Sequence, residues 1–310
     1  MKEFSRDMIV VLGPTASSKT AFAAKLAKDM NGEVISADSR QVYRDMNLGT
    51  GKDYEDYTVE GEHIPYHLID ILPPGYKYNV YEFQKDFLKV YNDLKSRNKL
   101  PILCGGTGMY IEAVLKGYKL LHVPPDHAVR KDLEKKSLEE LKKILRSYAS
   151  RLHNTTDLTS KKRTIRAIEI AKYYQEHPRN DIAYPAINPL ILGISFDRPV
   201  QRRRITERLK KRFDEGMVDE VKSLMNKGLS ADDLVYYGLE YKYITQYLTG
   251  QYTYDEMFEK LNTAIHQFAK RQMTYFRRME KNGLKIHWID GHISLDEKLR
   301  RTDQIIAGGN

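Results

Sequence analysis

The chain has 310 residues, a net charge of +9 and one cysteine, Cys104, which excludes an intrachain disulfide. Its hydrophobic content of 41% is ordinary for a globular protein. The sequence contains neither an apolar run of about 20 residues nor a signal-peptide pattern, so we expect a cytoplasmic protein without a membrane partner. The positive charge is compatible with nucleic acid, a membrane surface or a small anionic substrate, and does not decide among them.

Strand and helix patterns alternate along much of the chain. Short apolar runs rich in β-branched residues predict buried parallel strands. These strands are expected at residues 8–12, 33–37, 100–104, 190–196 and 284–289. Helical patterns occupy residues 19–30 and the stretch from the capping residue Asn79 to about residue 97. The alternation predicts an α/β fold with a doubly wound parallel sheet.

A long segment without strand signals separates two of these strands. Residues 124–185 are rich in lysine and arginine and helical in pattern, which indicates an all-helical insertion domain. The α/β core then comprises residues 1–123 and 186–310, with residues 202–248 also helical.

The strongest local motif lies between the first expected strand and helix, where a phosphate-binding loop (P-loop) would stand. Its predicted phosphate-binding residues are Gly13, Pro14, Thr15, Ala16, Ser17, Ser18, Lys19 and Thr20. Backbone N–H groups of such a loop point at the anion, and Lys19 adds a point charge. The Thr20 hydroxyl is a predicted ligand of Mg²⁺. The motif indicates a P-loop NTPase-like core.

One position departs from the usual pattern G-x-x-x-x-G-K-[ST]. Ser18 occupies the place of the second glycine, so a left-handed backbone there would cost about 1 kcal/mol or more. An acidic residue at a strand end often helps to hold Mg²⁺. Asp38 and Asp70 are both candidates for that role, and the pattern does not choose between them.

Longer segments carry a more specific signal and follow one another in order along nearly the whole chain. They include residues 38–52, 105–110, 162–169, 216–221 and 268–277. With the loop, these segments closely resemble the tRNA dimethylallyltransferase family. The resemblance implies transfer of a dimethylallyl group from dimethylallyl diphosphate to the exocyclic amine of the adenosine 3′ to the anticodon, giving N6-isopentenyladenosine and diphosphate. It further implies Mg²⁺ as cofactor, tRNA as partner and a monomer without an obligate protein partner.

The resemblance also assigns candidate catalytic residues. Asp38, expected at the carboxyl end of a strand, is the candidate base for the amine, with a capping or Mg²⁺-organising role as the alternative. Thr107, in a glycine-rich turn, is a candidate donor to the diphosphate, with an ordinary helix cap as the alternative. Arg130 matches a basic position that faces the diphosphate or the tRNA. Arg208 is a further candidate for diphosphate binding.

The expected tRNA contacts lie in two segments. They are Asp38, Ser39, Arg40, Gln41, Lys162, Arg163, Thr164, Ile165 and Arg166. Arg163 and Arg166 are one helical turn apart and share a face, so they can reach neighbouring phosphates, although charge runs are often only solvated. For Gln41 the alternative to a base contact is a hydrogen bond within its own loop.

Two other functions remain open on the sequence alone. An adenylate isopentenyltransferase would share the fold and loop but would have AMP, ADP or ATP as acceptor, and a basic insertion would have no purpose in it. A P-loop nucleotide kinase or a nucleotide-gated RNA-binding module would consume or sense ATP, and the segment at residues 38–52 speaks against it. We expect a prenyl transferase, not a phosphotransferase.

Overall fold

The computed structural model describes residues 4–148, 158, 160–177 and 184–308. The chain divides into two compact units, with residues 1–116 and 186–310 in the larger and residues 117–185 in the smaller. The smaller unit thus begins somewhat before residue 124, where the change in composition places the insertion. Among the described residues, no helix combines the length and the apolar character needed to cross a membrane.

The larger unit is built on a parallel sheet, which confirms the predicted fold class. Among the described residues its strand order is β5-β2-β6-β1-β7-β8, and every neighbouring pair is parallel. The strands are β1 (Met8–Leu12), β2 (Gly32–Ser36), β5 (Tyr66–His67), β6 (Leu100–Gly105), β7 (Pro189–Ser195) and β8 (Ile286–Asp290). A separate antiparallel pair joins β3 (Thr58–Val59) to β4 (Glu62–His63). β3, β4 and β5 have two residues each, too few to show the alternation of apolar and polar residues by which a strand is predicted from sequence.

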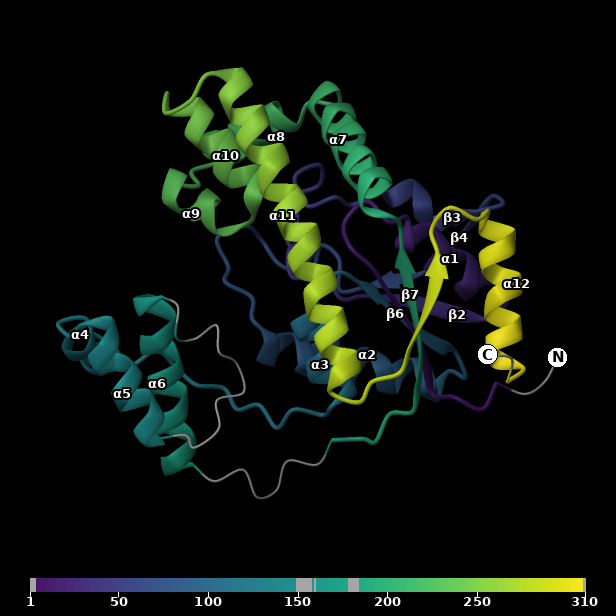
Figure 1. Ribbon diagram of the computed structural model, residues 1–310, viewed down its shortest axis with the longest axis horizontal. Helices are drawn as coiled ribbons and strands as arrows, with labels where there is room; N and C mark the ends of the chain where they lie inside the picture. The colour runs from purple at the N-terminus through teal and green to yellow at the C-terminus, as the bar shows by residue number, and fades with distance from the viewer. Residues whose placement is uncertain (1–3, 149–157, 159, 178–183, 309–310) are drawn as a thin grey trace. The chain divides into compact units, whose positions relative to one another are not determined.

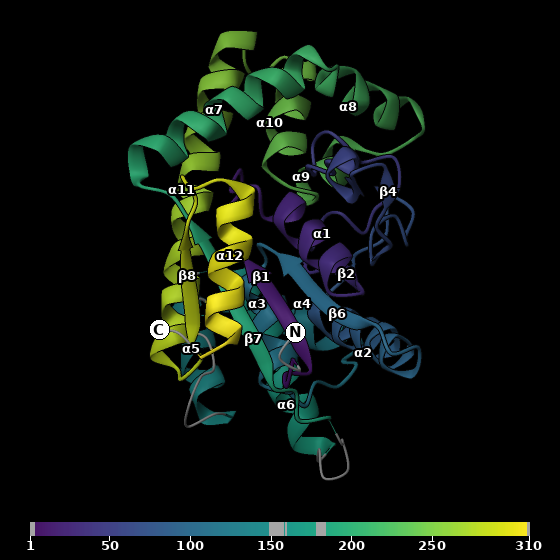
Figure 2. The same cartoon turned by 90° about the vertical axis from the view of Figure 1, so that its right-hand side faces the viewer.

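Helices cover both faces of the sheet (Figures 1 and 2). The helices described in this unit are α1 (Lys19–Asp29), the 3-10 helix η1 (Tyr54–Tyr57), α2 (Val80–Ser96), α3 (Gly108–Leu115), α7 (Arg198–Asp214), α8 (Met217–Asn226), α9 (Ala231–Tyr236), α10 (Leu239–Leu248), α11 (Tyr254–Lys281) and α12 (Leu295–Ile306). Asn79 caps α2 as expected, because its side chain accepts from two backbone N–H groups of the first turn.

Alternate residues of β1 enter two different hydrophobic cores. Ile9 and Val11 pack with α1 and α12, whereas Val10 and Leu12 pack with α2, α3 and α11. Both faces of β1 are fully buried, which explains why its sequence is a continuous apolar run and not an alternating one.

The position of the site follows from this layering. After β1 the chain enters α1 on one face, and after the neighbouring strand β6 it enters α3 on the other. Between two such strands a crevice opens at the carboxyl ends, where ligands bind in doubly wound sheets. β2 lies on the other side of β6, so three adjacent segments meet at this edge.

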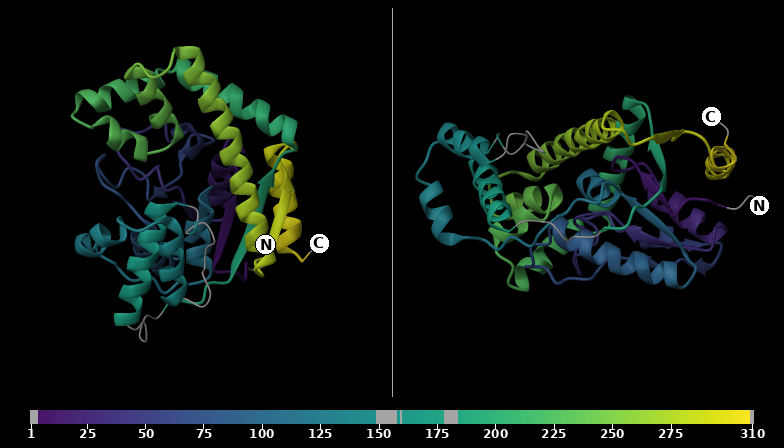
Figure 3. Two further views of the ribbon diagram at one scale, coloured as in Figure 1. Left: turned by 60° about the vertical axis from the view of Figure 1, so that its left-hand side comes forward. Right: turned by 90° about the horizontal axis from the view of Figure 1, so that it is seen from below.

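The smaller unit is helical in its described part (Figure 3). It contains α4 (His127–Leu133), α5 (Leu138–Tyr148) and α6 (Lys161–Glu176). Their apolar faces form a core of their own, made of Leu133, Leu141, Leu145, Ile165 and Ile168.

Candidate active site

The phosphate-binding loop follows β1 and leads directly into α1. Ala16 and Ser18 have left-handed backbones, with φ values of 59° and 57°. Ser18 therefore has the backbone conformation for which its glycine-like position was expected to cost about 1 kcal/mol. Among the described residues, no protein acceptor receives the N–H groups of residues 16–18. These donors remain for a ligand.

Side chains of α7 hold the loop through its oxygen atoms. Gln201 Nε2 donates to Thr15 O at 2.6 Å, and Arg204 Nε donates to Ala16 O at 3.0 Å. A second bond from Arg204 reaches the Ser18 hydroxyl oxygen at 2.7 Å. Because these bonds end on oxygen atoms, they fix the loop without occupying its N–H groups.

A buried amide of α11 joins this loop to the loop after β6. Gln272 Oε1 accepts from Thr15 N at 2.9 Å, and Gln272 Nε2 donates to Gly106 O at 3.0 Å. A Cβ on Gly106 would lie 2.4 Å from Gln272 Nε2, so only glycine permits this approach. Gln272 thus sets the spacing of two loops that border the crevice.

A cavity of about 900 Å³ opens beside the phosphate-binding loop. Its lining includes residues 16–20, residues 52–56 and side chains of α7. Lys19 is among these residues, with Nζ 3.4 Å from Pro14 O. Burial lowers the pKa of its ammonium group below the ordinary value. The N-terminus of α1 adds partial positive charge, so the end of the cavity at this loop is suited to an anion.

Two arginines of α7 meet one carboxylate in the same cavity. Asp53 is ion-paired with Arg208, and its Oδ1 lies 3.1 Å from Arg212 Nη2. Burial raises the pKa of Asp53, but the two guanidinium groups outweigh that effect and hold it below its ordinary value. Arg208 Nη1 also lies 3.5 Å from Thr15 Oγ1, so the arginine predicted to bind diphosphate stands beside the loop.

Asp38 and Thr107 come from neighbouring strand ends and lie within one hydrogen-bonded turn. Asp38 Oδ1 accepts from Arg40 N at 2.8 Å, and Thr107 Oγ1 accepts from Ser39 N at 3.2 Å. Thr107 occupies the N-cap position of α3 but makes no side-chain capping bond. This geometry speaks against the alternative of an ordinary cap and leaves the hydroxyl hydrogen of Thr107 for a ligand.

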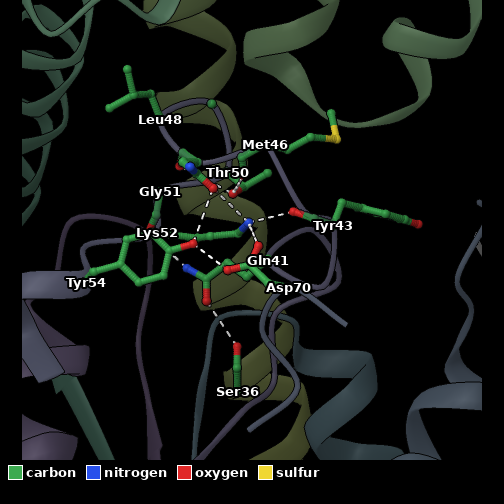
Figure 4. Close-up of polar contacts among 12 residues, drawn as sticks. Ser36, Gln41, Tyr43, Met46, Leu48, Thr50, Gly51, Lys52, Tyr54 and Asp70 are labelled. Carbon is green, nitrogen blue, oxygen red and sulfur yellow. Dashed lines mark hydrogen bonds and ion pairs between the residues drawn. The ribbon is translucent and has the colours of Figure 1, made fainter. Parts of the chain in front are cut away.

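The residues after Asp38 divide between two roles. Arg40 places its guanidinium 4.8 Å from the ring centroid of Tyr236, a cation–π contact. Gln41 is bonded within its own surroundings, since Oε1 accepts from Ser36 Oγ at 3.0 Å and Nε2 donates to Gly51 O at 2.9 Å (Figure 4). These hydrogen bonds of Gln41 are the loop contact that the sequence analysis named as the alternative to a base contact.

Lys52 is the polar centre of the segment at residues 38–52 (Figure 4). Its ammonium group donates to the carbonyl oxygen of Tyr43 and to Asn47 Oδ1, the latter at 3.1 Å, and is ion-paired with Asp70. Burial lowers its pKa, while Asp70 acts to raise it. The side chain is only 1% exposed and its ammonium group is engaged by these three partners, so Lys52 holds the segment together.

Glu220 of α8 holds the same segment from outside. Its carboxylate accepts the N–H groups of three consecutive residues, 47 to 49, at 2.7–3.0 Å. The Tyr241 hydroxyl donates to it as well, at 2.6 Å. This is an anion-binding nest of backbone donors that the protein fills with its own carboxylate.

The residues beside the cavity supply few protein ligands for Mg²⁺. Thr20 lines the cavity, whereas Asp70, one of the two candidate partners, is engaged by Lys52 and the Tyr54 hydroxyl. In the described part of the chain, no group of three or more His, Cys, Asp or Glu side chains could hold a metal. Mg²⁺ keeps several waters and takes other ligands from substrate phosphates, so the Thr20 hydroxyl would supply one protein ligand among several.

The remaining predicted residues lie in the smaller unit. Arg130 of α4 is ion-paired with Glu169 of α6. Lys162 and Arg163 are exposed on α6, and the Arg166 side chain is 38% exposed. Thr164 and Ile165, with exposed fractions of 0% and 5%, face the interior of the unit, so in this predicted segment only the three basic side chains reach the surface.

Known proteins resemble this chain over almost its whole length. A family model described as IPP transferase matches residues 41–279, and one described as isopentenyl transferase matches residues 6–64. A tRNA dimethylallyltransferase of Bacteroides fragilis is 58% identical over 298 residues, covering 96% of this chain and 97% of that protein. One from Parabacteroides distasonis is 57% identical over 302 residues, with coverage of 97% and 98%.

The chain belongs to the IPP transferase family. A solved tRNA isopentenylpyrophosphate transferase of Bacillus halodurans superposes with a TM-score of 0.71 at 32% identity, covering 98% of this chain and 96% of that one. A eukaryotic dimethylallyltransferase acting on tRNA has a TM-score of 0.78 at 21% identity, covering 99% and 81%, and supports the fold alone.

Several side chains that shape this IPP transferase site were not singled out from the sequence. They are Gln201, Arg212, Asp53, Glu220, Gln272 and Lys52, and in the smaller unit the same holds for Glu169, the partner of Arg130. Lys52, Glu169, Glu220 and Gln272 all lie inside the family segments quoted above, so motif membership was an available signal. Their contacts reach far along the chain, and no local spacing could identify the partners.

Proposed function

We propose that this chain transfers a dimethylallyl group from dimethylallyl diphosphate to the exocyclic amine of the adenosine 3′ to the anticodon in tRNA. The products are N6-isopentenyladenosine and diphosphate, and the enzyme acts as a monomer in the cytoplasm. The observation that carries the proposal is the meeting of Asp38, Thr107 and the phosphate-binding loop on adjacent strand ends. Membership of the IPP transferase family supports it.

The phosphate-binding loop receives the diphosphate. Free N–H groups of residues 16–18, the Lys19 ammonium and the Arg208 guanidinium stabilise the negative charge that grows as the leaving group departs. The Thr107 hydroxyl donates to a diphosphate oxygen, since its own oxygen is held by Ser39 N. Bound Mg²⁺, held by Thr20 and diphosphate oxygens, would neutralise part of the same charge.

Asp38 takes the proton of the acceptor. The adenine amine forms a bond to the allylic carbon, the carbon–oxygen bond breaks, and its electron pair leaves with diphosphate. The amine proton passes to the Asp38 carboxylate, which the Arg40 N–H holds in orientation through Oδ1. The target adenosine must leave its stack to reach this point, which is easier in an anticodon loop than in a duplex.

The basic residues of the smaller unit bind the phosphates of the anticodon stem-loop. Lys162, Arg163 and Arg166 lie on α6, and Arg130 lies on the adjoining α4. This contact favours tRNA over a free adenine nucleotide as acceptor, because a mononucleotide does not need an extended track of phosphate-binding residues.

Mass spectrometry of tRNA nucleosides tests the reaction directly. After incubation of unmodified tRNA with the protein, Mg²⁺ and dimethylallyl diphosphate, we expect one adenosine to gain the mass of one isopentenyl unit. Modification of free AMP, ADP or ATP instead would point to an adenylate isopentenyltransferase. ATP consumption without any prenylated product would point to a P-loop kinase.

Asp38→Asn tests the base. We expect kcat to fall about 10²- to 10⁴-fold, because proton removal is lost, with the KM for tRNA almost unchanged. Asp45→Asn is the matched control, since Asp45 lies in the same segment but pairs with Lys227 at the surface. Full turnover by the Asp38 variant would contradict its role as base.

A further inference from the structure

Glu169 ties together two arginines of the smaller unit. Its Oε1 accepts from Arg130 Nε at 2.7 Å, and its Oε2 accepts from Arg130 Nη2 at 2.8 Å and Arg166 Nη1 at 3.2 Å. The backbone N–H of Asp126 fills the remaining site on Oε1 at 3.0 Å. A carboxylate has about four acceptor positions, so that of Glu169 is saturated.

Burial differs sharply between the carboxylate and its partners. The Glu169 side chain is 1% exposed, whereas those of Arg130 and Arg166 are 34% and 38% exposed. The carboxylate is therefore hidden beneath two guanidinium groups that reach the surface of the unit. Burial raises the pKa of Glu169, but the bonds from Arg130, Asp126 and Arg166 lower it below its ordinary value, so the group stays charged.

Both arginines keep donors for an external anion. A guanidinium has five N–H groups. Arg130 directs two of them to Glu169, and Arg166 directs one to Glu169 and one to Val123 O at 2.7 Å. The three charged side chains together carry a net charge of +1. The cluster is thus an anchored pair of cations with unused donors.

Stability alone is a weak reason for such a cluster. Desolvation of a buried ion pair often cancels its Coulombic gain, and apolar residues can replace it at no loss. The unit already has a hydrophobic core that includes Ile165 and Ile168 on the same helix as Glu169. What the Glu169 carboxylate adds, by accepting four hydrogen bonds, is a fixed geometry for the two arginines that donate to it.

We propose that Glu169 is a positioning residue, which holds Arg130 and Arg166 as a preformed pair for the phosphates of the tRNA substrate. The inference rests on the proposed contact of these two arginines with tRNA. A free arginine loses side-chain entropy when it binds a phosphate, and a guanidinium already held by Glu169 loses less of it. Preformed geometry therefore strengthens tRNA binding although Glu169 itself is negative.

The sign of the effect of Glu169→Gln separates positioning from simple charge. If Glu169 only offset positive charge, its neutralisation would leave the cluster more positive and tRNA would bind more tightly. If it positions the arginines, the glutamine, which has one acceptor oxygen in place of two, no longer holds them and tRNA binds more weakly. We expect the KM for tRNA to rise about tenfold, with kcat at saturating tRNA and the KM for dimethylallyl diphosphate unchanged.

The measurement uses the full chain, unmodified tRNA and dimethylallyl diphosphate at several salt concentrations. Arg130→Lys and Arg166→Lys keep the charges but lose the forked contact, so they should raise the KM for tRNA even if the Glu169 variant folds poorly. Glu33→Gln is the matched control, a buried glutamate of the larger unit that is bonded to Arg97 and His67. It should change thermal stability without changing the KM for tRNA.

A triple variant completes the test. If Glu169 acts only through the two arginines, Glu169→Gln added to Arg130→Ala/Arg166→Ala should change the KM for tRNA less than twofold. An unchanged or lowered KM for tRNA in Glu169→Gln alone would overturn the inference. A normal KM and salt dependence in Arg130→Ala/Arg166→Ala would instead remove the proposed arginine contact itself, and with it the inference.

Discussion

The phosphate-binding loop at residues 13–20 and the segment at residues 38–52 both follow strands of one sheet, yet they are held in opposite ways. The first is held mainly through its oxygen atoms, by Gln201 and Arg204, and its N–H groups at residues 16–18 stay unoccupied among the described residues. The second gives three consecutive N–H groups to Glu220. Backbone N–H groups that are to bind an anion stay free, whereas those of residues 47–49 are used internally to keep the shape of the segment.

The two loops also differ in the charge of the side chains that hold them. A neutral amide, Gln272, joins the phosphate-binding loop to Gly106, whereas the buried ammonium group of Lys52 and the half-buried carboxylate of Glu220 hold the other segment. The side chains bonded directly to the first loop, Gln201, Arg204 and Gln272, are neutral or cationic, and a carboxylate in their place would repel the diphosphate proposed to bind there. Substitution of a charged side chain that holds residues 38–52 should therefore change mainly the stability of the protein. Substitution of a neutral side chain that holds the phosphate-binding loop should change mainly catalysis with dimethylallyl diphosphate.

The largest expected effect is on stability, from Lys52→Met. The change leaves the Asp70 carboxylate without its ammonium partner and removes the donor to the Tyr43 carbonyl oxygen. We expect the free energy of unfolding to fall by about 3 kcal/mol, measured by urea denaturation. Lys28→Met is the control, because Lys28 pairs with Glu60, which is 63% exposed, and should lose less than about 1 kcal/mol. Equal losses in the two variants would show that buried charge does not hold the segment.

The same contrast explains how far the sequence could be read. Loops 13–20 and 38–52 are continuous stretches whose backbone roles depend on spacing, so their place at strand ends and the parallel sheet were predictable. Apart from Lys52, the side chains that hold them come from residues 201–272, and nothing in local spacing links Gln272 to Thr15. Thr107 shows the same limit, since its hydroxyl meets Ser39 N across two strands instead of capping its own helix.

A smaller effect, on catalysis, is expected from Gln272→Leu. One part-buried and one buried hydrogen bond are lost, and Thr15 N and Gly106 O each lose a partner. We expect kcat/KM for dimethylallyl diphosphate to fall about 30-fold, which corresponds to about 2 kcal/mol, while the KM for tRNA stays the same.

Gln84→Leu is the matched control for Gln272→Leu. Its amide is also buried and donates to a backbone oxygen, Ala113 O, at 2.9 Å, but it joins α2 to α3 away from the phosphate-binding loop. It should lower stability without changing the KM for dimethylallyl diphosphate. If both variants bind dimethylallyl diphosphate normally, the loop keeps its shape without Gln272, and α7 alone would account for the bracing.

The smallest expected effect concerns Ser18, where the backbone and the side chain of the first loop can be separated. Ser18→Ala keeps the left-handed backbone and loses the bond from Arg204 Nη2, so we expect a loss of about 1 kcal/mol in unfolding free energy. Ser18→Gly loses the same bond but relieves a strain of about 1 kcal/mol.

Glycine also adds freedom to the unfolded chain, which offsets part of that relief. Ser18→Gly should therefore lie close to the wild type and above Ser18→Ala in thermal unfolding measured without ligand. If the alanine variant proves as stable as the glycine variant, the left-handed conformation carries no cost at this position. The strain would then have to be absorbed by the surrounding bonds to Thr15 and Ala16, which hold the loop whatever residue stands at its turn.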